Sequence, residues 1–225
     1  MLSVFGIRMT SGRTLPKFTK VDESNIQDHA RLVAADQIFF LFEYTSRANY
    51  SYSKANSLIA NLKKRPSRSH LAEYGYKAQA MHDCAAWLAE AINPAWLNGA
   101  TLVPVPPSRA HGDPDYDDRI SRICQAIPQT FPIDVRELVV QTVSTPAAHE
   151  GDRPAVEDLL RIYQIDETLT TPAPLRIAIV DDVLTAGTHY RAMHTVLSGR
   201  FPGVPIVGMF IARRVFPNPF AVDIE

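Results

Sequence analysis

The stretch LRIAIVDDVLTAGTHY, residues 175–190, decides the fold. Its apolar run, residues 177–180, shows no alternation of apolar and polar side chains, which is typical of a strand covered on both faces. Asp181 and Asp182 follow where such a strand is expected to leave the sheet, and a small-residue loop, residues 185–188, leads into a helical pattern. This order predicts a ligand site at the end of a buried strand.

The chemistry of these residues points to a ribose-phosphate ligand. Backbone N–H groups in a tight loop form an anion site, and a helix N-terminus adds a favourable dipole. Gly187 permits close approach of the backbone, while the hydroxyls of Thr185 and Thr188 can donate hydrogen bonds. Asp181 and Asp182 can accept hydrogen bonds from vicinal ribose hydroxyls and can hold Mg²⁺ through water. The alternative is that the acids only cap a helix and the glycine only turns the chain; the complete order of features favours the ligand site.

Strand-like and helix-like segments alternate along the rest of the chain. Strands are expected over residues 37–44, 102–105, 135–140 and 204–215, and helices over residues 55–64, 69–92 and 116–126. This alternation predicts an α/β fold with a mainly parallel twisted sheet flanked by helices. Ligands of such sheets bind outside the carboxyl ends of the strands, so Pro106 and Asp181 are expected to line one crevice. Residues 1–36 show no clean period and form an N-terminal extension, followed by one domain over residues 37–225.

Composition limits the class of protein. The chain has 225 residues, 46% of them hydrophobic, a net charge of −1 and a pI of about 6.7. A net charge this close to zero gives no overall electrostatic attraction to nucleic acid or to an anionic membrane surface, which argues against both as partners. The sequence contains neither an apolar run of membrane-spanning length nor an apolar signal segment, so a cytoplasmic location is expected. Cys84 and Cys124 fall in apolar helical patterns and are expected to be buried thiols.

The motif resembles a known family. IVDDVLTAGT, residues 179–188, is similar to the phosphoribosyl-pyrophosphate (PRPP) motif of type I phosphoribosyltransferases, and its TAGT ending is closest to the form found in orotate phosphoribosyltransferases. Together with PVPPSR, residues 104–109, and NSLIANLKK, residues 56–64, it resembles the ComF-type group of this family. The resemblance implies a type I fold with a small hood, formed by residues 37–60 and the segment after residue 213. It also implies Mg²⁺ as cofactor and transfer of phosphoribosyl to or from a nucleobase or amine, with pyrophosphate as leaving group.

The resemblance also implies roles for individual residues. Asp181 and Asp182 would hold the ribose hydroxyls and Mg²⁺, and the 5′-phosphate would be held by Thr185, Ala186, Gly187, Thr188 and His189. Ser108 and Arg109 are candidates for the pyrophosphate loop, because a guanidinium can make paired hydrogen bonds to a diphosphate. An ordinary surface loop is the alternative for this pair.

Other candidates lie in a basic cluster and in a polar segment. Lys63 belongs to the basic cluster of residues 63–68, which suits either a diphosphate or a solvated helix end. His149 and Arg153 lie in the polar segment of residues 142–154, where these enzymes carry a loop that closes over the substrates. That segment is poor in lysine here, which favours an alternative function, a non-catalytic sensor of PRPP or a nucleotide. A third alternative is an interaction module, in which residues 37–44 and the C-terminal tail contact a second copy or a protein partner.

Overall fold

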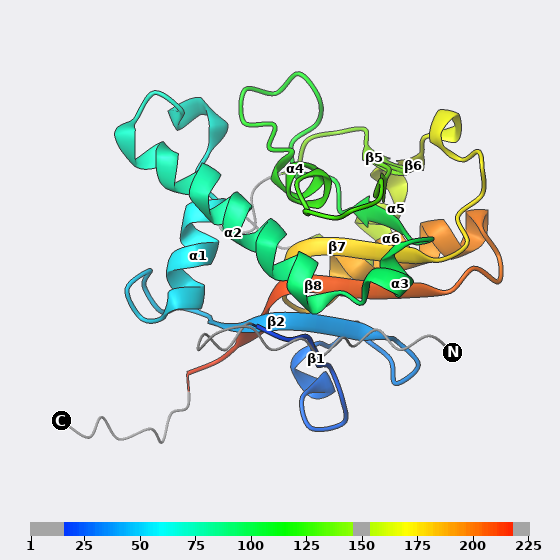
Figure 1. Ribbon diagram of the computed structural model, residues 1–225, viewed down its shortest axis with the longest axis horizontal. Coiled ribbons are helices and arrows are strands. Elements are labelled where there is room, and N and C mark those ends of the chain that lie inside the picture. The colour runs from blue at the N-terminus through cyan, green and yellow to red at the C-terminus, as the bar shows by residue number, and fades with distance from the viewer. Residues whose placement is uncertain (1–15, 146–153, 218–225) are drawn as a thin grey trace.

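The computed structural model describes residues 16–145 and 154–217, and Figure 1 shows their arrangement. Within these residues, the larger sheet has six strands in the order β1-β2-β8-β7-β3-β4. Their bounds are β1 (Thr19–Lys20), β2 (Ile38–Thr45), β8 (Ile206–Val215), β7 (Ile177–Leu184), β3 (Thr101–Pro104) and β4 (Asp134–Val135). Every pairing is parallel except that of β1 with β2. The expected α/β class with a mainly parallel sheet is therefore confirmed.

Helices cover both faces of this sheet (Figure 1). One face carries α1 (Lys54–Leu62), α2 (Gly75–Ala91), α3 (Pro94–Leu97) and α4 (Arg119–Gln125), and the other carries α5 (Val156–Ile162) and α6 (Thr188–Arg200). The short antiparallel pair of β5 (Val139–Gln141) and β6 (Tyr163–Ile165) lies beside α5 and α6. Single 3₁₀ turns are η1 (Ile26–Asp28), η2 (Pro66–Arg68), η3 (Ala72–Tyr74) and η4 (Glu167–Leu169). None of the described helices has the length and apolar character needed to cross a bilayer.

The central strand β7 explains why its sequence shows no alternation. Ala178 and Val180 point into the core beneath α1, α2, α3 and α4. Ile177 and Ile179 point into the core beneath α6 on the other face. Each of these side chains is at most 2% exposed. Because both faces of β7 are covered by helices and shielded from solvent, the residues that point to either face are apolar, as the sequence predicts for a strand covered on two sides.

The end of β7 differs from the expectation. The strand continues to Leu184, so Asp181 and Asp182 lie within it rather than after it. Asp181 is in register with Phe210 of β8, and pairing continues through Leu184. The reason is the length of β8, whose unbroken ladder extends β7 beyond the two carboxylates.

Two further expectations were wrong in part. The helix expected over residues 69–92 begins only at Gly75; the 3₁₀ turn η3 directly precedes it, and η2 ends before residue 69. The strand expected over residues 135–140 is divided, since β4 belongs to the large sheet and β5 to the small one. Arg136 lies at the break, where its guanidinium donates hydrogen bonds to Asp134 and to the carbonyl of Leu169.

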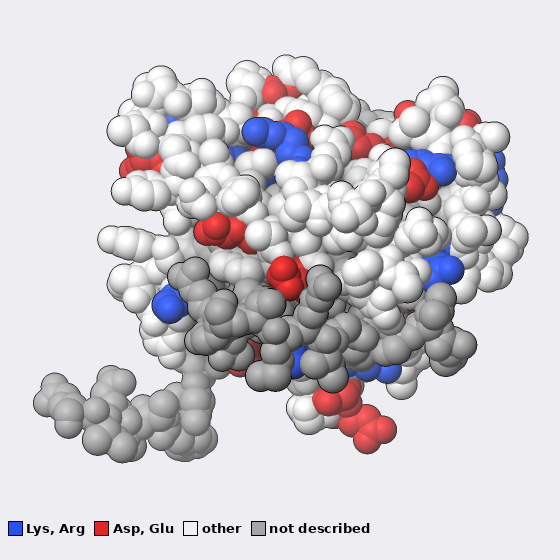
Figure 2. Space-filling model, in the orientation of Figure 1, with Lys and Arg blue, Asp and Glu red and all other residues white. Residues whose placement is uncertain are grey.

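The surface and the cysteines agree with the composition. Acidic and basic side chains are interspersed on the face shown in Figure 2, in keeping with the net charge of −1. Cys84 and Cys124 are free and buried, as expected. Burial raises the pKa of the Cys84 thiol, and raises that of Cys124 to about 12, so both remain protonated at neutral pH.

Candidate functional site

A crevice opens where the parallel strands β3 and β7 end, the place where sheets of this kind bind ligands. The crevice is open to solvent, and its space together with the solvent at its mouth is about 1310 Å³. The end of α1, the loop after β3, the start of α4, β7 and the start of α6 all contribute to the wall. These segments are far apart in the chain and meet only through the parallel topology.

The crevice brings together most of the residues singled out in the sequence. Its wall includes Lys63, Pro106, Ser108, Arg109, Asp181, Asp182, Thr185 and His189. Ala186, Gly187 and Thr188 complete the loop between Thr185 and His189 without forming part of that wall. His149 and Arg153 lie outside the described residues.

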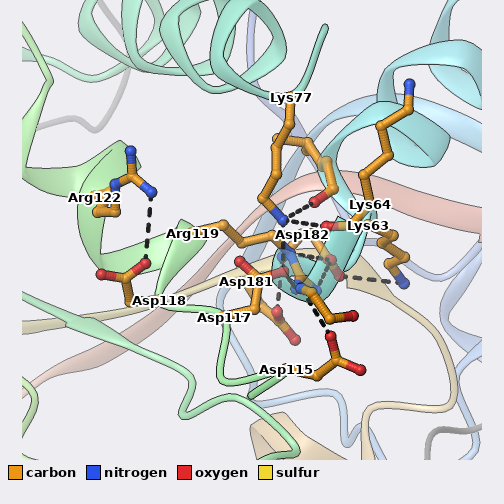
Figure 3. A network of polar contacts seen from close by, with 12 residues as sticks. Lys63, Lys64, Lys77, Asp115, Asp117, Asp118, Arg119, Arg122, Asp181 and Asp182 are labelled. Atoms are coloured by element: carbon orange, nitrogen blue, oxygen red, sulfur yellow. Dashed lines mark hydrogen bonds and ion pairs between the residues drawn. The ribbon is translucent and has the colours of Figure 1, made fainter. Parts of the chain in front are cut away.

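Asp182 is held by two cations (Figure 3). Its Oδ2 accepts hydrogen bonds from the Arg119 guanidinium, at 2.6 Å from Nη2 and 3.2 Å from Nε. Its Oδ1 lies 3.6 Å from the Lys63 ammonium, and the Asp182 side chain is almost completely buried. Burial alone raises the pKa of Asp182, but Lys63 and Arg119 outweigh this effect and hold it below its usual range. Asp182 is therefore a carboxylate whose charge is already compensated within the protein.

The charge network continues from Arg119 to Asp117 and Lys77 (Figure 3). Arg119 Nη1 lies 2.7 Å from Asp117 Oδ2, which also lies 2.6 Å from the Lys77 ammonium. Lys77 is only 2% exposed, and its ammonium donates to the carbonyls of Leu62 and Lys64, each at 2.8 Å. The lysine thus joins α2 to the end of α1, so the position of Lys63 depends on it.

Sequence reasoning did not assign a role to either of these cations. Arg119 falls in the helix expected over residues 116–126 and lies in the crevice wall. Its partner Asp182 is 63 residues away, so no local pattern could reveal the contact. Lys77 did leave a signal, because it precedes Met81, Cys84 and Leu88 at helical spacing on the buried face of α2. A lysine at an apolar position of a helix needs buried acceptors, and these are the carbonyls at the end of α1.

Asp181 has the opposite environment to Asp182. Its Oδ1 accepts the Asp182 backbone N–H at 2.7 Å, and within the described part of the chain no lysine or arginine forms an ion pair with it. Burial, and then repulsion by the Asp182 carboxylate, raise the pKa of Asp181 to about 7. The free side of this carboxylate faces the crevice, so Asp181 is the acid that can accept a hydrogen bond from a ligand.

The loop after β7 has the conformation expected of an anion site. Gly187 has φ 85° and forms the N-cap of α6. Within the described residues, the amide N–H groups of Ala186 and Gly187 have no hydrogen-bond acceptor. The first turn of α6 adds the positive end of its dipole at the same place. An anion beside Thr185 would therefore meet unsatisfied donors rather than carbonyl oxygens.

His189 adds a neutral donor to this end of the crevice. Its Nδ1 lies 2.8 Å from the Tyr163 hydroxyl. Burial lowers the pKa of His189 to about 4 and raises that of Tyr163, so at neutral pH the imidazole is uncharged and the phenol protonated. When Tyr163 donates to Nδ1, the ring proton lies on Nε2, which can donate to an anion.

The loop after β3 is fixed by the end of β5. The Ser108 carbonyl accepts the Thr145 N–H at 2.8 Å and the Gln141 side-chain amide at 2.7 Å. The Ala110 N–H donates to the Ser144 hydroxyl at 2.9 Å. Ser108 and Arg109 are thus supported by residues 141–145, of which Thr145 also lines the crevice.

The donor set fits a magnesium ion only with help from a ligand. In residues 16–145 and 154–217, no group of three or more His, Cys, Asp or Glu is arranged to hold a metal. Mg²⁺ is commonly bound by one or two carboxylates together with substrate phosphates and water. Asp181 offers such an oxygen in the crevice, whereas both oxygens of Asp182 already contact cations. Asp181 therefore fits as the protein's ligand to a substrate-bound Mg²⁺.

Comparisons with known proteins add no assignment. No family model matches the sequence, and no curated protein is significantly similar to it.

Proposed function

We propose that the protein is a type I phosphoribosyltransferase-like protein that binds Mg²⁺ and PRPP in this crevice. The observation that carries the proposal is the meeting of three features at one crevice: the Asp181 carboxylate, Thr185 and His189 on either side of a loop whose amide donors are unsatisfied, and the cations Lys63 and Arg109. A sugar with hydroxyls and two separate phosphate groups matches this set. The resemblance of the sequence motif to the PRPP motif supports the same ligand.

In this proposal, each part of PRPP would have a partner at the crevice. Asp181 would accept hydrogen bonds from the ribose 2′- and 3′-hydroxyls, and the loop with His189 Nε2 would hold the 5′-phosphate. Lys63 and Arg109 would face the diphosphate, where Arg109 can make paired hydrogen bonds. Arg119 and Asp182 would fix Lys63 rather than bind the sugar, because their charges satisfy one another.

The reaction would be a displacement at ribose C1′. A nitrogen nucleophile of a base or amine forms a bond to C1′, while the bond from C1′ to the diphosphate oxygen breaks and its electron pair leaves with pyrophosphate. A proton is then lost from the nitrogen. Mg²⁺, when bound, would neutralise charge that develops on the diphosphate. The residues of this chain would act by positioning and by stabilising the leaving group.

A second function is favoured by the compensated charge of Asp182. Because Asp182 is held by Arg119 and Lys63, only one acid of the pair remains for ligand and metal. A site of this kind can bind PRPP or a nucleotide without turnover, as a sensor would.

Calorimetric titration and product assays separate these possibilities. Mg²⁺-PRPP should bind to the parent protein and to Glu90→Gln, a control on the exposed surface of α2, but only weakly to Asp181→Asn. Equal affinity in Asp181→Asn and the parent would contradict the site. Pyrophosphate release in a screen of bases and amines would identify an enzyme, and binding without release would identify a sensor.

A further inference from the structure

The segment after η1 lies against the back of the loop of residues 185–188. His29 is completely buried, and its Nδ1 contacts the Thr185 carbonyl oxygen. The backbone N–H of Arg31 donates to the Ala186 carbonyl oxygen at 2.8 Å. Of the described residues that line the crevice, none comes from this segment. The N-terminal segment therefore contacts the loop on the side away from the crevice.

These contacts orient the amide donors of the loop. In a trans peptide, the C=O of one residue and the N–H of the next point in opposite directions. Since the carbonyls of Thr185 and Ala186 face the N-terminal segment, the N–H groups of Ala186 and Gly187 face away from it. The Leu32 side chain closes the back of the loop, 3.0 Å from where a Cβ on Gly187 would lie.

The segment is itself anchored to α6 and β8. The Arg191 guanidinium on α6 forms an ion pair with Asp36 and donates from Nε to the Arg31 carbonyl at 3.1 Å. Asp28 lies 3.0 Å from Arg213 of β8. Helix α6, whose N-terminus follows the loop, is thus bonded to the same N-terminal segment that contacts the loop. A displacement of one element would be transmitted to the other.

His29 is suited to donate to a carbonyl. Burial lowers the pKa of His29, and Arg213 and Arg214 also oppose a positive charge there, although the hydrogen bond to the Thr185 carbonyl and the charge of Asp28 favour it. The ring is therefore neutral at physiological pH, and since its partner is a carbonyl, Nδ1 carries the proton. Within the described residues, the buried Nε2 has no partner, so the Thr185 carbonyl is the contact that fixes this side chain.

We propose that His29, supported by residues 31–36, is a positioning residue that holds the loop with its N–H groups turned toward the 5′-phosphate. The assignment of the ligand rests on the function proposed above. The orientation of the loop does not, because it follows from contacts within the protein. Loss of the His29 donor should free the Thr185–Ala186 peptide to rotate and should weaken binding of a 5′-phosphate specifically.

The test compares two changes at one position with two probes. His29→Asn keeps an N–H donor close to the place of Nδ1, whereas His29→Leu removes it; His82→Leu on the exposed side of α2 is the matched control. We expect His29→Leu to bind ribose 5-phosphate about tenfold more weakly, by analogy with the loss of other supporting contacts. Pyrophosphate, which does not use the loop, should bind all variants equally, and His29→Asn should recover affinity for ribose 5-phosphate.

The outcomes separate this inference from the proposed function. Equal affinity of His29→Leu and the parent for ribose 5-phosphate, or equal losses for both probes, would overturn the positioning role. If the parent binds neither probe nor PRPP, the proposed function fails, and amide NMR resonances then test the inference. The amide resonances of Ala186 and Gly187 should shift or broaden in His29→Leu but not in His82→Leu. Unchanged resonances in His29→Leu would overturn the positioning role of His29. If His29→Leu does not fold, Asp36→Asn, which loosens the Arg191 anchor, is expected to give a smaller change of the same kind.

Discussion

Asp181 and Asp182 are neighbours in the chain with opposite electrostatic surroundings. Asp182 contacts Arg119 and Lys63, and its pKa lies below the usual range. Asp181 lies beside that charge without a cation of its own among the described residues, and its pKa is raised to about 7. Two acids whose environments separate their pKa values commonly have separate roles. Here Asp182 organises the cations, and Asp181 is left to interact with the ligand.

Ligand binding should depend on the ionisation of Asp181. The affinity for Mg²⁺-PRPP is expected to rise as the pH increases from 6 to 8, because the carboxylate must lose its proton to accept hydrogen bonds or approach Mg²⁺. Calorimetry across this range measures the effect. In Asp181→Asn, only the titration of PRPP itself should remain, so an identical pH profile in the two proteins would contradict the assignment.

The same carboxylate should reduce stability at high pH. Its folded pKa of about 7 exceeds the unfolded value of 3.8, so the folded state retains a proton that the unfolded state has lost. Stability is therefore complete below about pH 4 and decreases as the pH rises through 7. Asp181→Asn should raise the free energy of unfolding by roughly 1–2 kcal/mol at pH 8, after allowance for partial solvent exposure, and should change it little at pH 4. Urea unfolding at both pH values measures this, and equal effects would contradict it.

Lys77 should be important for folding rather than for contact with the ligand. Lys77→Met should lower the free energy of unfolding by roughly 3 kcal/mol, because it removes one charge of a buried network and leaves two carbonyls at the end of α1 without a donor. Lys54→Met, at the exposed start of α1, is the control. Chemical denaturation compares the two, and a similar small loss in both would show that the network contributes little.

At the scale of elements, β7 and α6 are joined by a tight turn that requires a glycine. Gly187 has φ 85°, a region that side chains with a Cβ adopt at a cost of about 1–2 kcal/mol, and Leu32 occupies the neighbouring space. Gly187→Ala should therefore destabilise the fold by at least that amount and weaken phosphate binding. Gly199→Ala, in the same helix and with no atom within 4 Å of the new Cβ, should be neutral or stabilising. Thermal unfolding measures both variants, and a Gly187→Ala protein as stable as Gly199→Ala would contradict this description of the turn.

The elements that could be predicted from the sequence are those whose pattern is decided by burial. β7 was predicted because both of its faces are dry, and α1 because its apolar residues share one face. The end of β7 could not be predicted, since it depends on pairing with β8. The same reason applies to Arg119, whose place in the site depends on the distant Asp182. Local patterns identify a strand or loop, whereas contacts across the sheet decide where it ends and what it binds.

At the scale of the whole molecule, the parallel sheet assembles the crevice. Parallel pairing of β3 with β7 places the loop containing Ser108 next to the acids of β7, which the alternation of strands and helices predicted. The apolar run of residues 37–44, considered for a partner contact, lies in β2 between β1 and β8, and Ile38, Phe39, Phe40 and Leu41 are buried. These side chains belong to the core of the fold. The C-terminal tail from residue 218 lies outside the described residues.

The N-terminal extension contributes more to this assembly than its sequence indicated. Its described part adds β1 to the sheet and places His29 and Leu32 behind the loop of residues 185–188. A short segment without periodicity gives no sign of such contacts, because they join it to a strand and a loop elsewhere in the chain. The crevice therefore depends on residues that precede the domain expected from the sequence.

The most direct test is a crystal structure of the protein with Mg²⁺ and PRPP. We expect the 5′-phosphate on the amide N–H groups of Ala186 and Gly187, the ribose hydroxyls at Asp181, and the diphosphate toward Lys63 and Arg109, with the contact between Asp182 and Arg119 intact. PRPP bound elsewhere, or bound here with its 5′-phosphate away from the loop of residues 185–188, would contradict the assignment of the site.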